Sequence, residues 1–149
     1  MRQRRIFAEM SLPGPIDLLK ARKLKGVMLV CVLDPSWITL TLRTITRDHK
    51  NLQRVAIDAS DTVHEAVFDH DQPIHPGEVL GDNAYEGWLE LDGLLAQLWE
   101  SHSICLEVLY DGFDSVDENG ARSWMECLLP EVMGKGKAEL VGIGSGWVW

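Results

Sequence analysis

The chain has 149 residues, 46% of them hydrophobic, which is typical of one globular domain with a sizeable core. Its formal net charge of −9 is uneven: residues 1–54 hold 11 of the 14 Lys and Arg but 4 of the 23 Asp and Glu, a net of +7, and residues 55–149 carry −16. No apolar run approaches the roughly 18 residues of a membrane span, so we expect a soluble chain and no membrane partner.

The cysteines Cys31, Cys105 and Cys127 are odd in number, far apart in sequence and flanked by apolar residues. The chain shows neither a CxxC spacing nor a secretory apolar segment. This pattern is typical of reduced core cysteines in a reducing compartment. We therefore expect a cytoplasmic or nuclear protein.

After an N-terminal extension at residues 1–18, a short apolar phrase recurs, in which one apolar residue is followed by two more, three and five positions later. Its four occurrences are residues 24–29, 52–57, 105–110 and 138–143. Because alternate residues of a strand share a face, the last two apolar side chains of each phrase would lie on the same face of a strand. The central residues Val27, Val55, Val108 and Val141 are separated by 28, 53 and 33 residues, so the period is irregular.

Helical periodicity fills the intervals between these phrases. Ser36 is expected to cap a first helix that ends near Asp48. Its predicted inner side chains are Trp37, Leu40, Thr41, Thr44 and Ile45. A longer helix follows, with an inner stripe of Ala84, Tyr85, Trp88, Leu91, Leu94, Leu95, Leu98 and Trp99. A third helix is expected to begin near Asp117 or Asn119 and to end at Pro130, with Ala121, Trp124, Met125 and Leu128 inside.

Strands that alternate with helices imply a parallel sheet, arranged either as a compact open sheet with helices on both faces or as a solenoid. The recurring phrase favours the second: a short leucine-rich-repeat-like α/β solenoid, with about four parallel strands in sequence order and helices on the other face. The predicted domain spans residues 19–143, with a loop insertion at residues 60–80 and a C-terminal tail at residues 144–149.

Four segments carry a resemblance to known proteins: DLLKARKLKGVML, WITLTLRTITRDHKNLQRVAI, WLELDGLLAQLWESHSICLEV and CLLPEVMGKGKAELV. Together they resemble the C-terminal leucine-rich-repeat region of fungal F-box-like proteins. In that family the strand and helix series ends in a Trp-x-x-Leu-Asp-x-Leu-Leu helix and a Leu-Leu-Pro-Glu segment. The resemblance runs from about Leu19 to Val141 and skips the loop at residues 60–78.

This resemblance implies a protein-interaction surface on a solenoid, in proteins whose N-terminal F-box docks a ubiquitin-ligase scaffold. The stretch SLPGPIDLL, residues 11–19, has the Leu-Pro opening of an F-box. The residues after it run straight into the first strand phrase and lack the apolar pattern of several helices. We therefore see no F-box and do not expect this chain to recruit the scaffold.

The stretch HEAVFDHDQPIHPGE, residues 64–78, places His64, His70 and His75 among acidic residues. A metal-binding protein or an enzyme built on these histidines is the alternative function. Their spacings of six and five match no known ligand pattern, and no cysteine lies nearby. We interpret the stretch as an acidic surface loop and expect no cofactor.

The basic cluster Lys20, Arg22, Lys23 and Lys25 could contact phosphate groups. No aromatic residues are interleaved with it, however, and the acidic remainder of the chain would repel a nucleic-acid backbone. We interpret the cluster as a solvated turn and do not expect a nucleic-acid partner.

The sequence thus favours a non-enzymatic protein-interaction domain, which within the resemblance would be the substrate-recognition part of an F-box-type adaptor. Its strand face and loop edge would contact an unidentified protein. The candidate contact residues are those that point away from the predicted core or lie beside such positions: Met28, Arg54, Ala56, Glu107 and Leu109.

Overall fold

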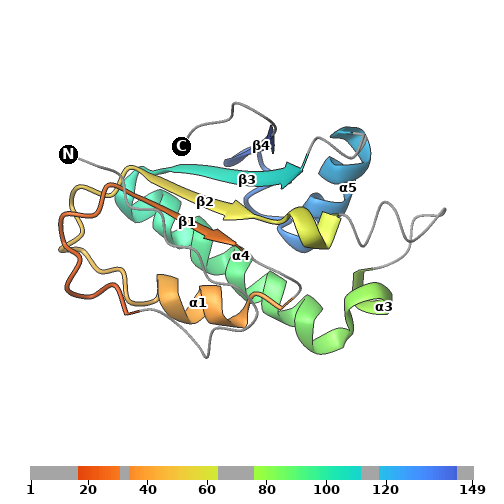
Figure 1. Cartoon of the computed structure of the whole chain (residues 1–149), viewed down its shortest axis with the longest axis horizontal. Coiled ribbons are helices and arrows are strands. Elements are labelled where there is room, and N and C mark those ends of the chain that lie inside the picture. Colours follow the sequence, from red (N-terminus) through yellow and green to blue (C-terminus); the bar gives the residue numbers. More distant parts are fainter. Residues whose placement is uncertain (1–16, 31–33, 64–75, 112–117, 144–149) are drawn as a thin grey trace.

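The computed structural model describes residues 17–30, 34–63, 76–111 and 118–143. Four strands form one all-parallel sheet in the order β1-β2-β3-β4, which is also their order along the chain (Figure 1). They are β1 (Gly26–Val30), β2 (Arg54–Asp58), β3 (Cys105–Asp111) and β4 (Ala138–Ile143). The predicted α/β class and the predicted parallel order of the four strands are therefore confirmed.

Helices connect the strands. They are α1 (Ser36–Leu42), α3 (Pro76–Leu80), α4 (Asp82–His102) and α5 (Glu118–Leu128). Residues 60–63 are also helical. Within the predicted loop insertion at residues 60–80, residues 60–63 and 76–80 are helical, and residues 64–75 lie outside the described residues. At the second end Pro76 is the first residue of α3, a position where its missing N–H has no intrahelical partner to lose.

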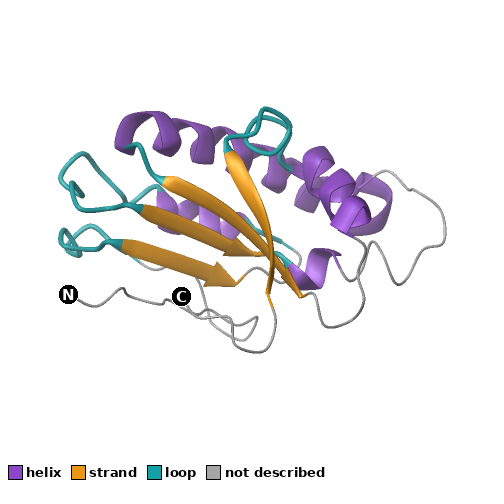
Figure 2. Ribbon diagram, turned by 90° about the horizontal axis from the view of Figure 1, so that it is seen from above, coloured by secondary structure: helices purple, strands orange, loops and turns teal. Residues whose placement is uncertain are grey.

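The core lies between one face of the sheet and the helices α1, α4 and α5, and Figure 2 shows the longest helix lying along that face. Alternate strand residues supply the sheet side, among them Val27, Val55 and Val108, each with at most 1% of its surface exposed. The largest fully buried side chain is that of Trp88 on α4. We call this the inner face of the sheet.

The strand register aligns Val27 with Val55, Val55 with Leu106, and Leu106 with Ala138. The central residues of the first two phrases, Val27 and Val55, therefore pair with each other. In β3 the phrase is shifted by two residues, since Ile57 rather than Val55 pairs with Val108. A shift of two residues keeps the same face, so Val108 still points to the core. In β4 the phrase selects the wrong face: Val141 packs against the opposite face, while Leu140 faces the core. Apolar residues occur on both faces of β4, as they also do in β1, so the recurring phrase alone does not identify the inner side.

Helix α1 departs most from its prediction. It ends at Leu42, and its N-cap position is held by Pro35 rather than Ser36. Leu40 is 47% exposed, and Ile38 and Leu42 are buried in its place. After Leu42 the chain continues in tight turns, with the N–H of Ile45 donating to the carbonyl of Leu42, so later side chains no longer follow the α-helical period.

The longer helices agree better with their predicted stripes. On α5 all four predicted inner residues are buried, and on α4 Trp88, Leu91, Leu95 and Leu98 are buried. Trp99 is 37% exposed, so it lies at the border of the core. Cys105 and Cys127 are free and exposed, which corrects the expectation of core positions for these two, while Cys31 lies outside the described residues. In the described ranges, no helix combines the length and the apolar character that a membrane crossing needs.

Candidate functional site: the outer face of the sheet and its basic end

All five candidate contact residues lie on the face of the sheet opposite α1, α4 and α5, which we call the outer face. Side chains at alternate strand positions build it. Met28 pairs with Ala56 across β1 and β2, and Ala56 pairs with Glu107 across β2 and β3. Arg54 and Leu109 occupy the same face two residues away along their strands. The structure thus brings together residues from positions 28 to 109 of the chain.

The centre of the outer face is apolar and tightly packed. Met28, Ala56 and Leu109 form one cluster, with 5%, 0% and 0% of their surface exposed, and Val141 packs against it. These side chains have almost no surface open to solvent, so direct contact with a partner would require uncovering them. Cys105 and Glu139, by contrast, are exposed positions on the same face.

A bidentate ion pair crosses the outer face between neighbouring strands. The Nε and Nη2 groups of Arg54 donate to the two carboxylate oxygens of Glu107, and the Nη2 to Oε2 distance is 3.0 Å. Glu107 is 8% exposed. Its hydrogen bond raises the pKa of Arg54, and burial acts in the opposite direction. Each group satisfies the other, so the pair positions β2 against β3.

The Cys105 thiol lies next to this pair. Cys105 is exposed overall, but partial burial of its thiol and then the negative charge of Glu107 raise its pKa, while the positive charge of Arg54 acts against them. A thiol with a raised pKa stays protonated at neutral pH and is a poor nucleophile. The Cys105 thiol is therefore a weak nucleophile at neutral pH.

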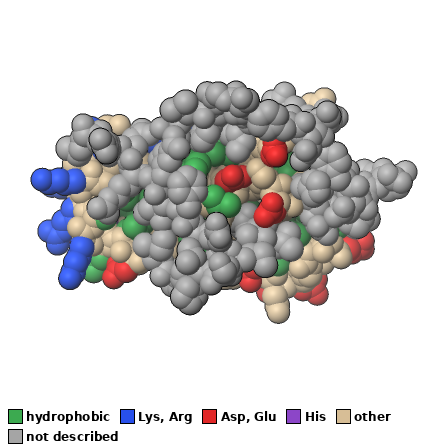
Figure 3. Space-filling model, viewed as in Figure 1, with side chains coloured by type: hydrophobic (Ala, Val, Ile, Leu, Met, Phe, Trp, Pro, Cys, Tyr) green, Lys and Arg blue, Asp and Glu red, His purple; other side chains and the backbone are tan. Residues whose placement is uncertain are grey.

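A dense group of cations lies where β1 and β2 begin. We call it the basic end; it consists of Lys20, Arg22, Lys23, Lys25, Arg47 and Lys50. All six are exposed except Lys25, which is partly buried. Figure 3 shows Lys and Arg side chains gathered at one end of the molecule, where Figure 1 places the turns that precede β1 and β2. The sequence pattern identified the first four of these cations. Arg47 and Lys50 lie in the turn before β2, which the pairing of β1 with β2 places beside the turn before β1.

A buried histidine holds the two turns of the basic end together. His49 has no exposed surface. Its Nδ1 accepts a hydrogen bond from the N–H of Thr46 at 2.9 Å, so the ring proton lies on Nε2, which donates to the carbonyl of Leu18 at 2.8 Å. The carbonyl of Lys25 accepts from the N–H of Gln53 at 2.7 Å. The backbone that carries the cations is therefore fixed at several points.

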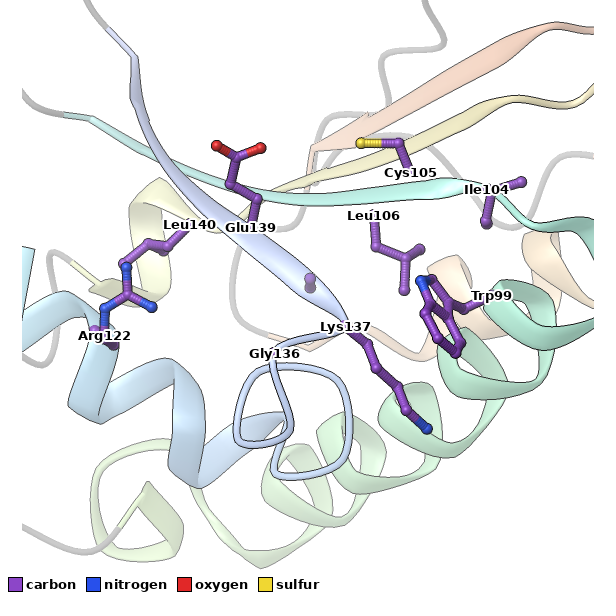
Figure 4. A pocket seen from close by; sticks show the side chains of 10 residues that line it. Trp99, Ile104, Cys105, Leu106, Arg122, Gly136, Lys137, Glu139 and Leu140 are labelled. Carbon is purple, nitrogen blue, oxygen red and sulfur yellow. The ribbon is translucent and has the colours of Figure 1, made fainter.

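A pocket of about 450 Å³ lies at the start of β3 and β4. Figure 4 shows Lys137 extending toward Trp99, and its Nζ lies 5.3 Å from the centre of that ring. Lys137 also pairs with Glu131 at 3.0 Å, so its charge is already balanced. Sequence periodicity does not predict this pocket, because its walls come from α4, α5, two strands and the turn before β4.

The histidines of the metal hypothesis, His64, His70 and His75, lie outside the described residues. Within the described ranges, no three His, Cys, Asp or Glu side chains are grouped so that they could hold a metal ion.

Comparison with protein-family models, curated proteins and solved structures found no match to the chain.

Proposed function

We propose that the chain is a non-enzymatic protein-interaction domain that contacts its partner through the outer face of the sheet and the adjoining loop edge. The observation that carries the proposal is the gathering of side chains from four strands on one face, where Cys105, Glu139 and part of Arg54 are open to solvent around the buried Met28, Ala56 and Leu109. A face that is built from several strands on a packed scaffold is a common arrangement for protein recognition.

We further propose that the domain is a short leucine-rich-repeat-like solenoid. Parallel strands that follow one another in sequence order, with the helices α1, α4 and α5 on the inner side, are what stacked repeats produce. In such a fold each strand and helix unit buries its apolar side only against its neighbours. The curved or flat strand face is then left for a partner.

Two motifs of the family resemblance are in contact, which supports treating them as parts of one unit. Asp92, in the Trp-x-x-Leu-Asp-x-Leu-Leu segment of α4, accepts a hydrogen bond from the N–H of Glu131, in the Leu-Leu-Pro-Glu segment, at 2.9 Å. On this basis the domain is proposed as the substrate-recognition part of an F-box-type adaptor in the cytoplasm or nucleus. Docking to the ubiquitin-ligase scaffold is not part of the proposal.

The exposed part of the outer face is where contact begins in this proposal. Cys105 and Glu139 are exposed there, and Arg54 keeps 26% of its side-chain surface open beside them. The buried cluster of Met28, Ala56 and Leu109 gives this surface a rigid base. A fixed base lowers the entropy that is lost when a partner binds.

Affinity capture from the native organism with three versions of the chain tests the proposal. The versions are the wild type, Glu139→Lys on the outer face, and Glu126→Lys at an exposed position of α5. Both substitutions change the net charge equally. We expect a reproducible partner that the wild type and Glu126→Lys retain and that Glu139→Lys loses, because a reversed charge in the contact surface repels a complementary partner.

Failure to recover any reproducible partner would contradict the proposal. So would equal recovery with all three versions, because the outer face would then not be the contact surface. Circular dichroism of each version shows whether the substituted chain is folded, which separates lost binding from lost structure.

A further inference from the structure

We propose that the basic end is a docking site for an acidic, Asp- and Glu-rich segment of a partner protein. This inference rests on the proposed function in that it names the chemistry of the partner, but it concerns a different surface from the outer face. The residues involved are the six cations of the basic end and the turns that carry them, residues 17–25 and 46–53.

The first observation is an excess of unbalanced positive charge. The two turns hold six Lys and Arg but two acidic residues, Asp17 and Asp48, a net of +4. The pair formed by Arg22 and Asp48 spans 3.9 Å between side chains that are more than 60% exposed, so it is weak. Lys20, Lys23, Lys25, Arg47 and Lys50 form no ion pair with any residue in the described ranges.

The second observation is that this excess is confined to one end. Beyond the basic end, the described part of the chain has five other Lys and Arg residues, and each has an interaction partner. Arg43 pairs with Glu90, Arg54 with Glu107, and both Lys135 and Lys137 with Glu131, while Arg122 has an interaction of its own. Each of these five cations thus has a partner within the chain, whereas five of the six cations of the basic end form no ion pair in the described ranges and remain available to an external anion.

The third observation is that the cations are held on a fixed backbone. His49 joins the two turns from inside, and the hydroxyl of Thr44 accepts a hydrogen bond from the N–H of Leu18 at 2.8 Å. From α4, His102 Nε2 donates to the carbonyl of Thr46 at 3.0 Å. A charged surface on an ordered backbone binds with a smaller loss of entropy than a flexible basic segment would.

The chemistry of the partner follows from what surrounds the basic end. Residues 55–149 carry a net charge of −16, which would repel a long polyanion that extends beyond the patch. The two turns contain no Phe, Tyr or Trp on which a base could stack, and His49 is buried. A short acidic protein segment fits the patch without meeting the acidic remainder, and it therefore fits better than a nucleic acid.

The test uses the full chain labelled with ¹⁵N and titrated, in separate samples, with a short oligoglutamate peptide, a neutral Gly-Ser peptide and a single-stranded oligonucleotide of the same charge as the oligoglutamate. We expect the oligoglutamate to shift the amide signals of residues 18–25 and 46–53 selectively. The affinity should fall steeply between about 50 mM and about 200 mM salt, because exposed charges are screened. The Gly-Ser peptide should produce no shifts.

Two variants that change the net charge equally locate the site. Lys23→Gln/Lys50→Gln removes two charges from the basic end, and Lys135→Glu makes the same change at an exposed position elsewhere. The double variant should bind the oligoglutamate about tenfold more weakly, since each exposed charge contact is worth up to about 1 kcal/mol. Lys135→Glu should bind within about twofold of the wild type.

Several results would overturn the inference: shifts outside the two turns, equal affinity in the double variant, or tighter binding of the oligonucleotide than of the oligoglutamate. Sedimentation at low salt tests whether the anion is a second copy of the chain, and a dimer that the double variant dissociates would also overturn it. If a partner is captured by the wild type, lost by Glu139→Lys and retained by the double variant, the proposed function stands and this inference fails. If the oligoglutamate binds as expected while no partner is captured, the proposed function fails and this inference stands.

Discussion

Asp92, on α4, accepts a hydrogen bond at its Oδ1 from the backbone N–H of Val132, which lies 40 residues later in the chain, at 2.9 Å. Its other carboxylate oxygen accepts from the N–H of Glu131. Asp92 is 5% exposed, so these bonds replace most of its contact with water. One buried carboxylate therefore joins the long central helix to the turn that leads into β4.

The substitution Asp92→Asn should destabilise the chain by about 1 to 3 kcal/mol. An amide has one acceptor oxygen, so one of the two backbone N–H groups would face an NH₂ group and lose its partner. Urea unfolding measures the change. The control Glu86→Gln, at an exposed position of the same helix, should stay within about 0.5 kcal/mol of the wild type. Equal stability of the two variants would show that the hydrogen bonds to Asp92 contribute little.

The same carboxylate predicts a pH dependence. Burial raises the pKa of Asp92 above its usual 3.8, although the hydrogen bonds from Val132 and Glu131 oppose the shift. Well below pH 3.8 the group is protonated in both the folded and the unfolded chain. As the pH rises from there through the higher pKa of the folded state, the unfolded chain releases its proton first, so the contribution of Asp92 to stability falls.

Carbon NMR of the Asp92 carboxyl group checks this expectation, and a midpoint at or below 3.8 would contradict it.

Glu131 acts in the opposite direction: its hydrogen bonds to Lys135 and Lys137 lower its pKa below the usual 4.5. Its contribution is therefore present above pH 4.5 and is lost as the pH falls through the lower pKa of the folded state. Urea unfolding of Asp92→Asn over the same pH range separates the two, because only the Glu131 effect remains.

Breaking the ion pair of the outer face should cost more than breaking an exposed one. In Glu107→Gln one N–H donor of Arg54 meets an amide NH₂ group in place of a carboxylate oxygen, in a largely buried position. We expect the free energy of unfolding to fall by about 1 to 3 kcal/mol. Replacing both residues by apolar ones, in Arg54→Met/Glu107→Leu, should restore most of the loss, because no charge is then left unpaired.

The matched control for this pair is Arg43→Gln, which breaks an ion pair with Glu90 between side chains that are 51% and 54% exposed. It should cost about 1 kcal/mol or less, since water screens such pairs. Chemical denaturation of all three variants decides the matter. A loss in Arg43→Gln as large as in Glu107→Gln would mean that burial of the outer pair has no energetic consequence.

His49→Ala should destabilise the chain by about 1 to 3 kcal/mol, because the N–H of Thr46 and the carbonyl of Leu18 both lose their partner. The turns of the basic end should also loosen. Hydrogen exchange is therefore expected to accelerate at residues 18–25 and 46–53 more than in α5. The neighbouring substitution Asn51→Ala, at an exposed position, should change neither property. Unaltered exchange in the two turns of His49→Ala would contradict the role given to this ring.

Sequence periodicity predicted the elements whose apolar pattern has one consistent phase. The four inner residues of α5 recur at helical spacing with polar residues between them, so that only one face could be buried. In β1 and β2 the apolar phrase likewise placed Val27 and Val55 on the inner face and Met28 and Ala56 on the outer one. The candidate contact face follows directly from that alternation.

What could not be predicted depends on contacts between distant segments. The inner side of β4 follows from the pairing of Leu106 with Ala138, which places Leu140 toward the core although the apolar phrase selects Val141. Asp92 occupies an inner position of α4 that only the backbone of Glu131 and Val132 makes favourable. In α1 the chain leaves the α-helical period after Leu42, and packing rather than spacing selects the buried residues.

The sequence by itself therefore determined the α/β class, the parallel order of the strands and the two faces of β1 and β2, because these follow from local periodicity and from the short reach of connecting segments. The tertiary structure alone decided the register of β4 and the burial of Asp92 and His49. It also decided that Arg47 and Lys50 lie beside the other four cations of the basic end. Each of these depends on hydrogen bonds between residues more than twenty positions apart, and no local pattern encodes such pairings.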